Sequence, residues 1–351
     1  MTDNNDLKTF LIIWFGQFVS LVGTGVTRFA LLIWAYQQTG EATTLALLGF
    51  FVFVPYALIS PFAGVLVDRF DRRKVMMATD GAMGVITITL LILFAQGQLA
   101  IWHLFIAEFL FGAFDAFQTP AYSAAMSVLI PKKQLGRMNG LMSLGQNASR
   151  VVAPFLGGAL LPLIQLNGVM WVDVVTFIIA MITLMIVRVP MPPTSDKTAS
   201  SGSWADSWAS VSFGLRFIWQ RPGLRGLMIL FAAANLLAGI TYFGVLPAMV
   251  LARSGSDELA LATVQAVLGI GGVIGAGLMT VWGGSQRKID TVLIGMAVSF
   301  LVGDLALGIG QSTLVWAVGA FSAQLFIPPL MGAMMAIFQS KIPLDQQGRV
   351  L

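Results

Sequence analysis

Long runs of apolar residues, interrupted by short polar or charged stretches, make up most of the sequence. The runs reach 18 or more residues, long enough for an α-helix to cross the roughly 30 Å of hydrocarbon in a bilayer. Their alternation with charged, glycine-rich and proline-rich connections predicts ten spans. These predicted spans are 9–36, 44–67, 75–95, 101–128, 138–162, 170–187, 224–251, 259–282, 291–309 and 312–339.

Composition supports a membrane protein and excludes a soluble one. Hydrophobic residues make up 57% of the 351 positions and charged residues only 10%, against about 25% charged residues in soluble domains. A fold in water cannot hide this much apolar surface. The first apolar run is longer than the core of a cleavable signal peptide, so we expect a retained span. The fold class that follows is all-α and polytopic, embedded in the membrane.

The basic residues divide the connections into two sets. One set, which includes the polar N-terminus, carries 17 of the 20 Lys and Arg residues, whereas the alternate set carries only Arg253. Because basic connections stay on the cytoplasmic side, the N-terminus is expected to be cytoplasmic. The predicted location is the plasma (inner) membrane, with multiple passes. This asymmetry also accounts for the net charge of +4, which in a soluble protein would suggest an anionic partner such as nucleic acid.

Two sequence features recur at nearly the same separation. PKKQLGRMNG at 131–140 recurs as PLDQQGRVL at 343–351, an offset of 212, and Arg73–Lys74 recurs as Arg287–Lys288, an offset of 214. Internal repeats of this kind are typical of membrane proteins built from two six-helix halves. The predicted divisions are an N-terminal six-helix bundle at 1–189, a cytoplasmic linker with an amphipathic helix at 190–222, and the first four spans of a C-terminal bundle at 223–351. Ten of twelve spans are then present, and we expect a truncated form.

The linker has two parts of different character. PMPPTSDKTASSGS has the composition of a flexible connection. In WADSWASVSFGLRFIWQR the apolar residues fall at helical spacing, which predicts an amphipathic helix on the inner membrane surface. The alternative is a helix packed on the cytoplasmic ends of the bundle. The apolar positions are Trp204, Trp208, Val211, Leu215 and Ile218.

A charged turn between the second and third spans resembles the signature loop of the major facilitator superfamily, G-x-x-x-D-R-x-G-R-R/K. Asp71 stands where that loop usually has Gly, a variant found in macrolide-efflux-like members. The resemblance implies a transporter fold of two six-helix halves. It also implies a conformational lock, in which Asp68 engages the other half near span eleven. The alternative is an ordinary cytoplasmic loop with a topogenic role. The matching residues are Gly64, Asp68, Arg69, Asp71, Arg72 and Arg73.

Spans four, five and eight carry further patterns. Span five is similar to the G-x8-G-x3-G-P-x2-G-G pattern of exporters in that family, with small residues replacing two glycines. The matching residues are Gly140, Ser149, Ala153, Pro154, Gly157 and Gly158. In span four, Glu108 stands where drug–proton antiporters of the family carry Arg, four residues before Gly112, so their proton-relay mechanism cannot be transferred. GIGGVIGAG at 269–277 predicts tight helix packing in span eight.

Five ionisable residues lie within spans, away from the ends: Arg28, Glu108, Asp115, Arg150 and Asp304. Each costs about 2.5–3.5 kcal/mol at a helix centre, so each needs a partner or a wet cavity. From their depths we expect Asp115 to pair with Arg150, and Glu108 with Arg28. Static ion pairs and a proton or substrate pathway both fit. Asp80, Asp173 and His103 lie near span ends, where interface water is expected to solvate them.

The expected function is secondary active transport, as a proton-coupled exporter of a small amphipathic compound of the drug or macrolide type. A siderophore or lysophospholipid transporter is the alternative within transport. A non-transporting membrane receptor or an inactive truncated remnant is the alternative of another class.

The expected partners are a small-molecule substrate, protons or another coupling cation, and the lipid bilayer, with the chain acting as a monomer. We expect no enzyme activity, catalytic residue, metal or cofactor. The sequence lacks a G-x-x-x-x-G-K phosphate loop. It has no Cys and a single His, which excludes disulfides and a histidine-based metal cluster.

Overall fold

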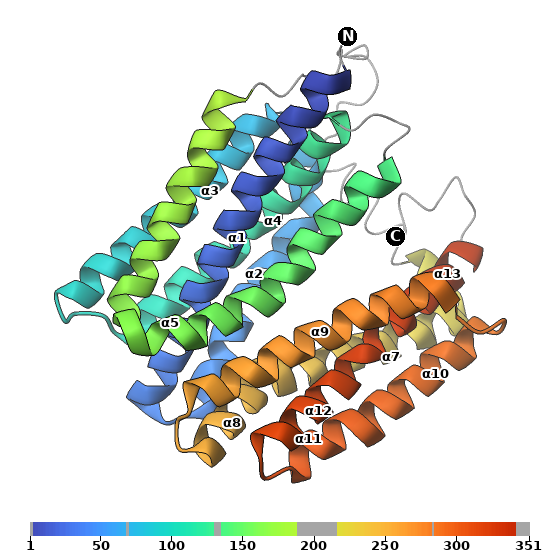
Figure 1. Ribbon diagram of the computed structural model, residues 1–351. Coiled ribbons are helices and arrows are strands. Elements are labelled where there is room, and N and C mark those ends of the chain that lie inside the picture. Colours follow the sequence, from blue (N-terminus) through green and yellow to red (C-terminus); the bar gives the residue numbers. More distant parts are fainter. Residues whose placement is uncertain (1–2, 68–69, 130–134, 188–215, 283, 342–351) are drawn as a thin grey trace. The chain divides into compact units, whose positions relative to one another are not determined.

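The computed structural model describes residues 3–67, 70–129, 135–187, 216–282 and 284–341. Regular structure within these residues is entirely helical (Figure 1), as the all-α prediction requires. A helix satisfies its own backbone N–H and C=O groups, which a bilayer core cannot do. The chain divides into two compact units, Met1–Ser201 and Gly202–Leu351. The boundary lies outside the described residues, so the linker at 190–222 stays a prediction.

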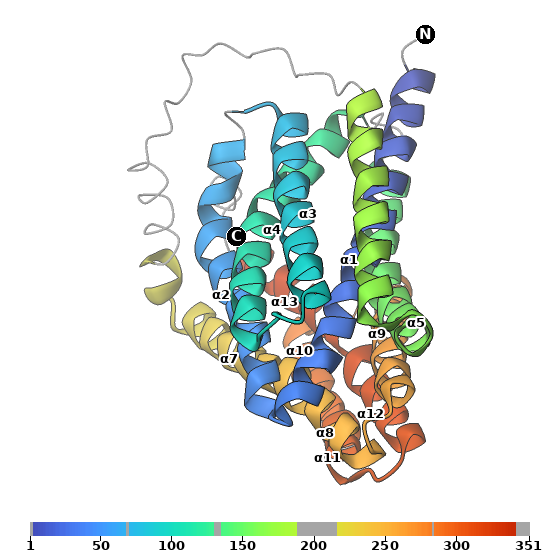
Figure 2. The ribbon, with the colours of Figure 1, turned by 90° about the vertical axis from the view of Figure 1, so that its left-hand side faces the viewer.

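The first unit consists of long helices that pack in pairs. They are α1 (Asp3–Thr39), α2 (Ala42–Val67), α3 (Arg72–Ala95), α4 (Ile101–Leu129) and α5 (Leu135–Ile186). Helix α1 packs along α5, α2 along α4, and α3 against both α4 and α5 (Figure 2). Helix α5 contains predicted spans five and six. It breaks at Gln165, where φ is 56° and ψ is 176°, a backbone region that residues other than Gly rarely adopt.

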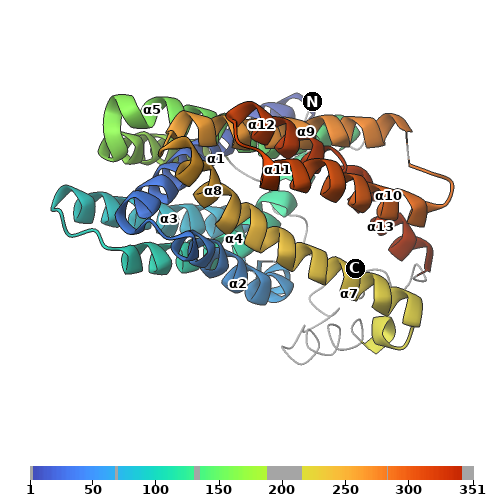
Figure 3. The same ribbon diagram turned by 90° about the horizontal axis from the view of Figure 1, so that it is seen from below.

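The second unit is built from helices with two π-helical segments. They are α7 (Pro222–Gly239), η2 (Ile240–Val245), α8 (Leu246–Ser254), α9 (Glu258–Trp282), α10 (Lys288–Val298), η3 (Ser299–Asp304), α11 (Leu305–Ile309), α12 (Thr313–Leu325) and α13 (Ile327–Lys341). Helix α9 packs along α12, and α10 along α13 (Figure 3). Because α9 and α12 correspond to predicted spans eight and ten, they repeat the pairing of spans two and four.

Eight of the described helical stretches are long and apolar enough to cross a membrane. The stretch Leu144–Ile186 is counted as one of the eight, although its 43 residues cover most of two predicted spans. Helix α4, which carries Glu108 and Asp115, is not among the eight. This number supports a multi-pass membrane protein but does not support the predicted count of ten spans.

Glycines allow two helix pairs to approach closely. A Cβ atom at Gly112 of α4 would overlap the carbonyl oxygen of Val52 in α2. Cβ atoms at Gly271 and Gly275 of α9 would overlap backbone carbonyl oxygens of α12. The tight packing predicted from the glycine-rich run at 269–277 is therefore confirmed.

The predicted amphipathic helix lies mostly outside the described residues. At its end, Phe217 and Ile218 are buried and form a small apolar cluster with Leu224 and Met228. Ile218 was assigned to the apolar face, and here that face contacts the start of α7. The choice between the membrane surface and the ends of the bundle stays a prediction, because the rest of this segment lies outside the described residues.

Candidate polar site of the first unit

A polar stripe runs along α1 and organises the interior of the first unit. It consists of Gln17, Ser20, Thr24 and Arg28, spaced three or four residues apart. This spacing places the four side chains on one face of a helix. Three of them make side-chain hydrogen bonds to acids on α3, α4 and α5.

Arg28 lies across the face of α4 and contacts both of its acids. Its Nη2 and Nε donate to the two carboxylate oxygens of Glu108, with the Nε contact at 3.3 Å. Its Nη1 lies 4.0 Å from Oδ2 of Asp115. The guanidinium is also 5.7 Å from the ring centroid of Phe111, between the two acids on the helix. One positive charge therefore faces two negative charges.

The two acids differ in exposure and in strength of contact. The side chain of Glu108 is 12% exposed and that of Asp115 is 42% exposed. The predicted pair of Arg28 and Glu108 is confirmed. The predicted pair of Asp115 and Arg150 is wrong, because Asp115 lies at Arg28 instead. Arg150 is exposed on α5 and makes no ion pair within the described residues.

Asp80 of α3 is held by neutral amides. Its Oδ2 accepts a hydrogen bond from Gln17 Nε2 at 2.7 Å, and its Oδ1 accepts one from Gln118 Nε2 at 2.7 Å. Gln118 Nε2 also donates to Gln17 Oε1 at 3.0 Å, and Gln118 Oε1 accepts from the Thr79 hydroxyl. The network links α1, α3 and α4 through a carboxylate that has no ion pair among the described residues.

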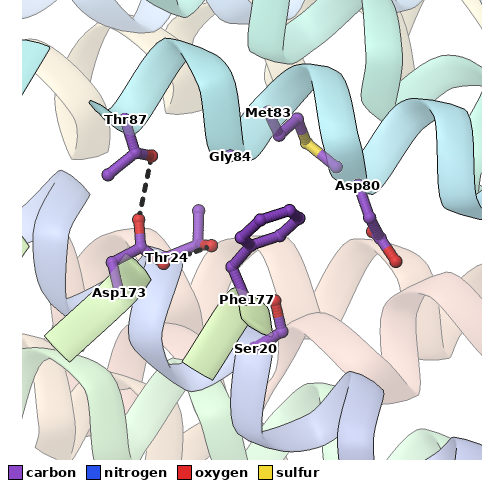
Figure 4. A pocket seen from close by; sticks show the side chains of 8 residues that line it. All are labelled: Ser20, Thr24, Asp80, Met83, Gly84, Thr87, Asp173 and Phe177. Carbon is purple, nitrogen blue, oxygen red and sulfur yellow. Dashed lines mark hydrogen bonds between the residues drawn. The ribbon is translucent and has the colours of Figure 1, made fainter. Parts of the chain in front are cut away.

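Asp173 of α5 is held by hydroxyl groups. Its Oδ1 accepts from Thr24 at 2.9 Å and its Oδ2 from Thr87 at 3.1 Å. Figure 4 shows the ring of Phe177 between this carboxylate and that of Asp80. A Cβ atom at Gly84 would lie 2.7 Å from that ring, so only Gly lets α3 approach α5 here.

A small pocket opens between these two networks. Its volume is about 20 Å³, enough for a single water molecule. Its lining combines two carboxylates with hydroxyl groups and an aromatic ring: Ser20, Thr24, Asp80, Met83, Gly84, Thr87, Asp173 and Phe177.

The expectation of interface solvation was wrong for two acids. Asp80 is 5% exposed and Asp173 is 2% exposed, and both carboxylates are satisfied inside the unit. The polar stripe of α1 was the sequence signal that would have located their partners. His103 is half-buried at the start of α4, where its Nδ1 accepts a hydrogen bond from Ala100 N at 3.0 Å.

The charged turn between α2 and α3 ties helix ends together. The Asp71 carboxylate accepts from Arg73 N at 3.0 Å and caps α3, a role that the usual Gly lacks. Arg73 donates to the carbonyl oxygens of Leu184 and Met185 at the end of α5, where a cation also suits the helix dipole.

Other members of the turn contribute differently. Arg72 donates to the Ala124 carbonyl oxygen at 3.0 Å. A Cβ atom at Gly64 would have no described atom within 4 Å. Asp68 and Arg69 lie outside the described residues, so the predicted lock stays a prediction.

The small residues of predicted span five let α5 lie close to α1 beside Arg28. A Cβ atom at Gly157 would lie 2.6 Å from the ring of Phe29, and one at Gly25 would lie 2.7 Å from Ala153 Cβ. Ser149, Pro154 and Gly158 are buried, and Gly140 lies in the first turns of α5. These contacts position the Arg28 backbone, which is a packing role.

The second unit contains one further acid from the predicted set. Asp304, the last residue of η3, accepts a hydrogen bond on Oδ1 from the Tyr242 hydroxyl of η2. Tyr242 was not predicted to be a site residue.

Comparisons with known proteins agree with this architecture. The sequence pattern of the Major Facilitator Superfamily matches residues 13–351. The chain is 28% identical over 351 residues to macrolide efflux protein A of Streptococcus pyogenes, covering 99% of this chain and 85% of that protein. It is 25% identical over 282 residues to the multidrug efflux pump Tap of Mycolicibacterium fortuitum, covering 78% and 67%. The nucleoside transporter NupG shares the fold, with a TM-score of 0.77 at 9% identity over 97% of this chain and 85% of that one.

Proposed function

The chain belongs to the Major Facilitator Superfamily, and from that premise we propose that it exports a small amphipathic compound of the drug or macrolide type. The related macrolide and multidrug efflux proteins, aligned over most of this chain, support this class of cargo. They favour it over a siderophore or lysophospholipid. They also favour transport over a receptor without transport activity.

The proposed topology has ten spans in the plasma membrane, with a cytoplasmic N-terminus. Two additions to the eight apolar stretches give this number. Helix α4 has 29 residues, and its two acids are neutralised in part by Arg28. Helix α5 has 52 residues, about 78 Å of helix at 1.5 Å per residue, and its break at Gln165 divides it into two crossings.

One observation carries the proposed coupling: a single arginine serves two carboxylates on one helix face. Arg28 holds Glu108 with two donors and reaches Asp115 only at 4.0 Å. The more exposed Asp115 is therefore the acid that can take up a proton or another cation without losing a close partner. Release of that proton would restore the attraction to Arg28. Rocking of the two halves would alternate between these states.

Transport by reconstituted protein tests this function. Proteoliposomes with an imposed pH gradient should accumulate a radiolabelled macrolide, and a protonophore should abolish the accumulation. Asp115→Asn should lower gradient-driven accumulation to the level of protein-free liposomes while macrolide binding persists. Arg150→Gln is the matched control and should transport normally, because Arg150 is exposed and unpaired in the described structure. Accumulation that is indifferent to the gradient, or full activity of Asp115→Asn, would contradict the coupling.

A further inference from the structure

A basic patch surrounds the start of α7 in the second unit. It consists of Arg216, Arg221 and Arg225, with Trp219 among them, and all four residues are exposed. The ion pairs among the described residues are those of Arg28, so none of the three patch arginines has an acidic partner there. Three like charges close together in the chain repel one another. The patch therefore favours an anionic partner from outside the chain.

Aromatic rings hold two of the patch arginines in place. The Cζ atom of Arg221 lies 3.4 Å from the ring centroid of Phe217, and its Nη1 donates to the Phe217 carbonyl oxygen at 3.2 Å. The Cζ atom of Arg225 lies 5.8 Å from the ring centroid of Trp219. A guanidinium held over a ring loses less conformational freedom when it binds an anion. A connection that only sets the topology needs the charge but not this arrangement.

Apolar contacts fix the patch to the body of the second unit. Phe217, which lies under Arg221, is buried in a small cluster with Leu224 of α7. Further along α7, Leu227 belongs to a second buried cluster that includes Val292 of α10 and Leu330 of α13. The backbone that carries the arginines is therefore packed against three helices of its own unit.

The place of the patch along the chain matches the headgroup level of a bilayer. The stretch Pro222–Ser254 is long and apolar enough to cross a membrane, so Arg221 directly precedes a span. Trp219 is 56% exposed, and Trp is enriched where a membrane meets water. Ile229, four residues after Arg225 and hence on the same helix face, is 51% exposed. This face changes from charged to apolar, as a phospholipid does from phosphate to acyl chain.

We propose that Arg216, Arg221 and Arg225 bind the phosphate group of an anionic phospholipid at the inner membrane surface. Guanidinium groups match phosphate oxygens with paired N–H donors. The connection before α7 belongs to the basic set that is expected in the cytoplasm, where the facing leaflet carries anionic lipid. Ile229 contacts the acyl chain, which a free phosphate ion lacks. The inference goes beyond the proposed export function, because it concerns the membrane and holds for any cargo.

Native mass spectrometry of the purified full chain, titrated in detergent with phosphatidylglycerol, tests the site. The double variant Arg221→Gln/Arg225→Gln should raise the apparent Kd of the most tightly bound phosphatidylglycerol at least about tenfold, because two attractive charges are lost. Arg221→Lys/Arg225→Lys keeps both charges and should lose less affinity, which separates loss of charge from loss of fold. Phosphatidylcholine with the same acyl chains should bind the wild type more weakly, because its headgroup has no net charge.

Arg287→Gln is the matched control for the single variant Arg225→Gln. Arg287 is exposed directly before α10 in the same unit and has no cation–π contact among the described residues. Its loss should change the apparent Kd less than about twofold. Equal losses in the two variants would show a diffuse positive surface and overturn the site. Displacement of the lipid by an equal concentration of inorganic phosphate would overturn it in favour of a free anion.

Discussion

Arg28 donates to Glu108 through two nitrogen atoms and approaches Asp115 with a third. One side chain therefore provides the positive charge for both acids of α4. Asp80 and Asp173 are treated differently, because amide and hydroxyl donors stabilise them without a counter-charge. Both carboxylates thus have hydrogen-bond partners on neighbouring helices but no ion pair among the described residues. The four acids are therefore held in two ways, two by a shared arginine and two by neutral donors.

The unequal contacts of Arg28 predict unequal effects on stability. Glu108→Gln should lower the free energy of unfolding by roughly 2 kcal/mol, because it breaks a charged, two-donor contact at a nearly buried carboxylate. Asp115→Asn should cost less than about 1 kcal/mol, since its carboxylate is more exposed and its contact is long. Thermal unfolding in detergent would measure both. Equal losses in the two variants would show that Arg28 binds both acids alike.

At the scale of helices, glycine residues determine which helix pairs can pack closely, because glycine has no side chain. Gly112 brings α4 onto the backbone of α2, and Gly275 brings α9 onto the backbone of α12. The break in α5 depends on Gln165 in an unfavourable backbone region. Pro162 and Gly168 lie on either side of it. Helix pairing in both units thus rests on local backbone geometry as well as on apolar burial.

Two glycines on α9 provide a matched pair for testing this packing. Gly275→Ala should destabilise the protein by about 1–3 kcal/mol, because the new Cβ would overlap the Leu325 carbonyl oxygen. Gly277→Ala has no described neighbour within 4 Å and should be neutral or stabilise by up to about 1 kcal/mol through helix propensity. Thermal unfolding of both variants gives the comparison. If Gly275→Ala unfolds at the wild-type temperature, α9 and α12 are not in backbone contact.

At the scale of the whole molecule, the distribution of basic residues predicts the orientation of the chain in the membrane. The connections on one side carry 17 of the 20 Lys and Arg residues. One of the basic residues of the charged turn, Arg73, also donates to carbonyl groups at the end of α5. We therefore expect Arg73 both to favour the cytoplasmic side for this turn and to hold it at the end of α5.

Reporter fusions test the orientation. An alkaline phosphatase fusion after Lys74 or Lys197 should be inactive, because both sites are expected in the cytoplasm. A fusion within 252–258 should be active, since that connection belongs to the external set. A green fluorescent protein fused at the same sites should give the reverse pattern. Active phosphatase after Lys74 would invert the topology and remove the basis for export.

The sequence by itself determined the all-helical class and the multi-pass membrane location. These properties are local, because transfer of a helix into hydrocarbon depends on the residues of that helix alone. The family resemblance of the turn at 64–73 depended likewise on contiguous residues. The Arg28–Glu108 pair could be predicted from the sequence, because the two residues have similar estimated depths in the bilayer and few other charged residues share that depth.

Only the tertiary structure decided which polar groups meet across helices. The sequence predicted that Asp115 pairs with Arg150 and that interface water solvates Asp80 and Asp173. These predictions were wrong because the depth of a residue in the bilayer does not fix the rotation of its helix about the helix axis. Thr24 and Asp173 are 149 residues apart, and Tyr242 and Asp304 are 62 apart. Contacts over such separations depend on how several helices pack together, with a π-helical turn shifting the faces of two of them. That packing, and not the spacing of charges along the chain, determined the site.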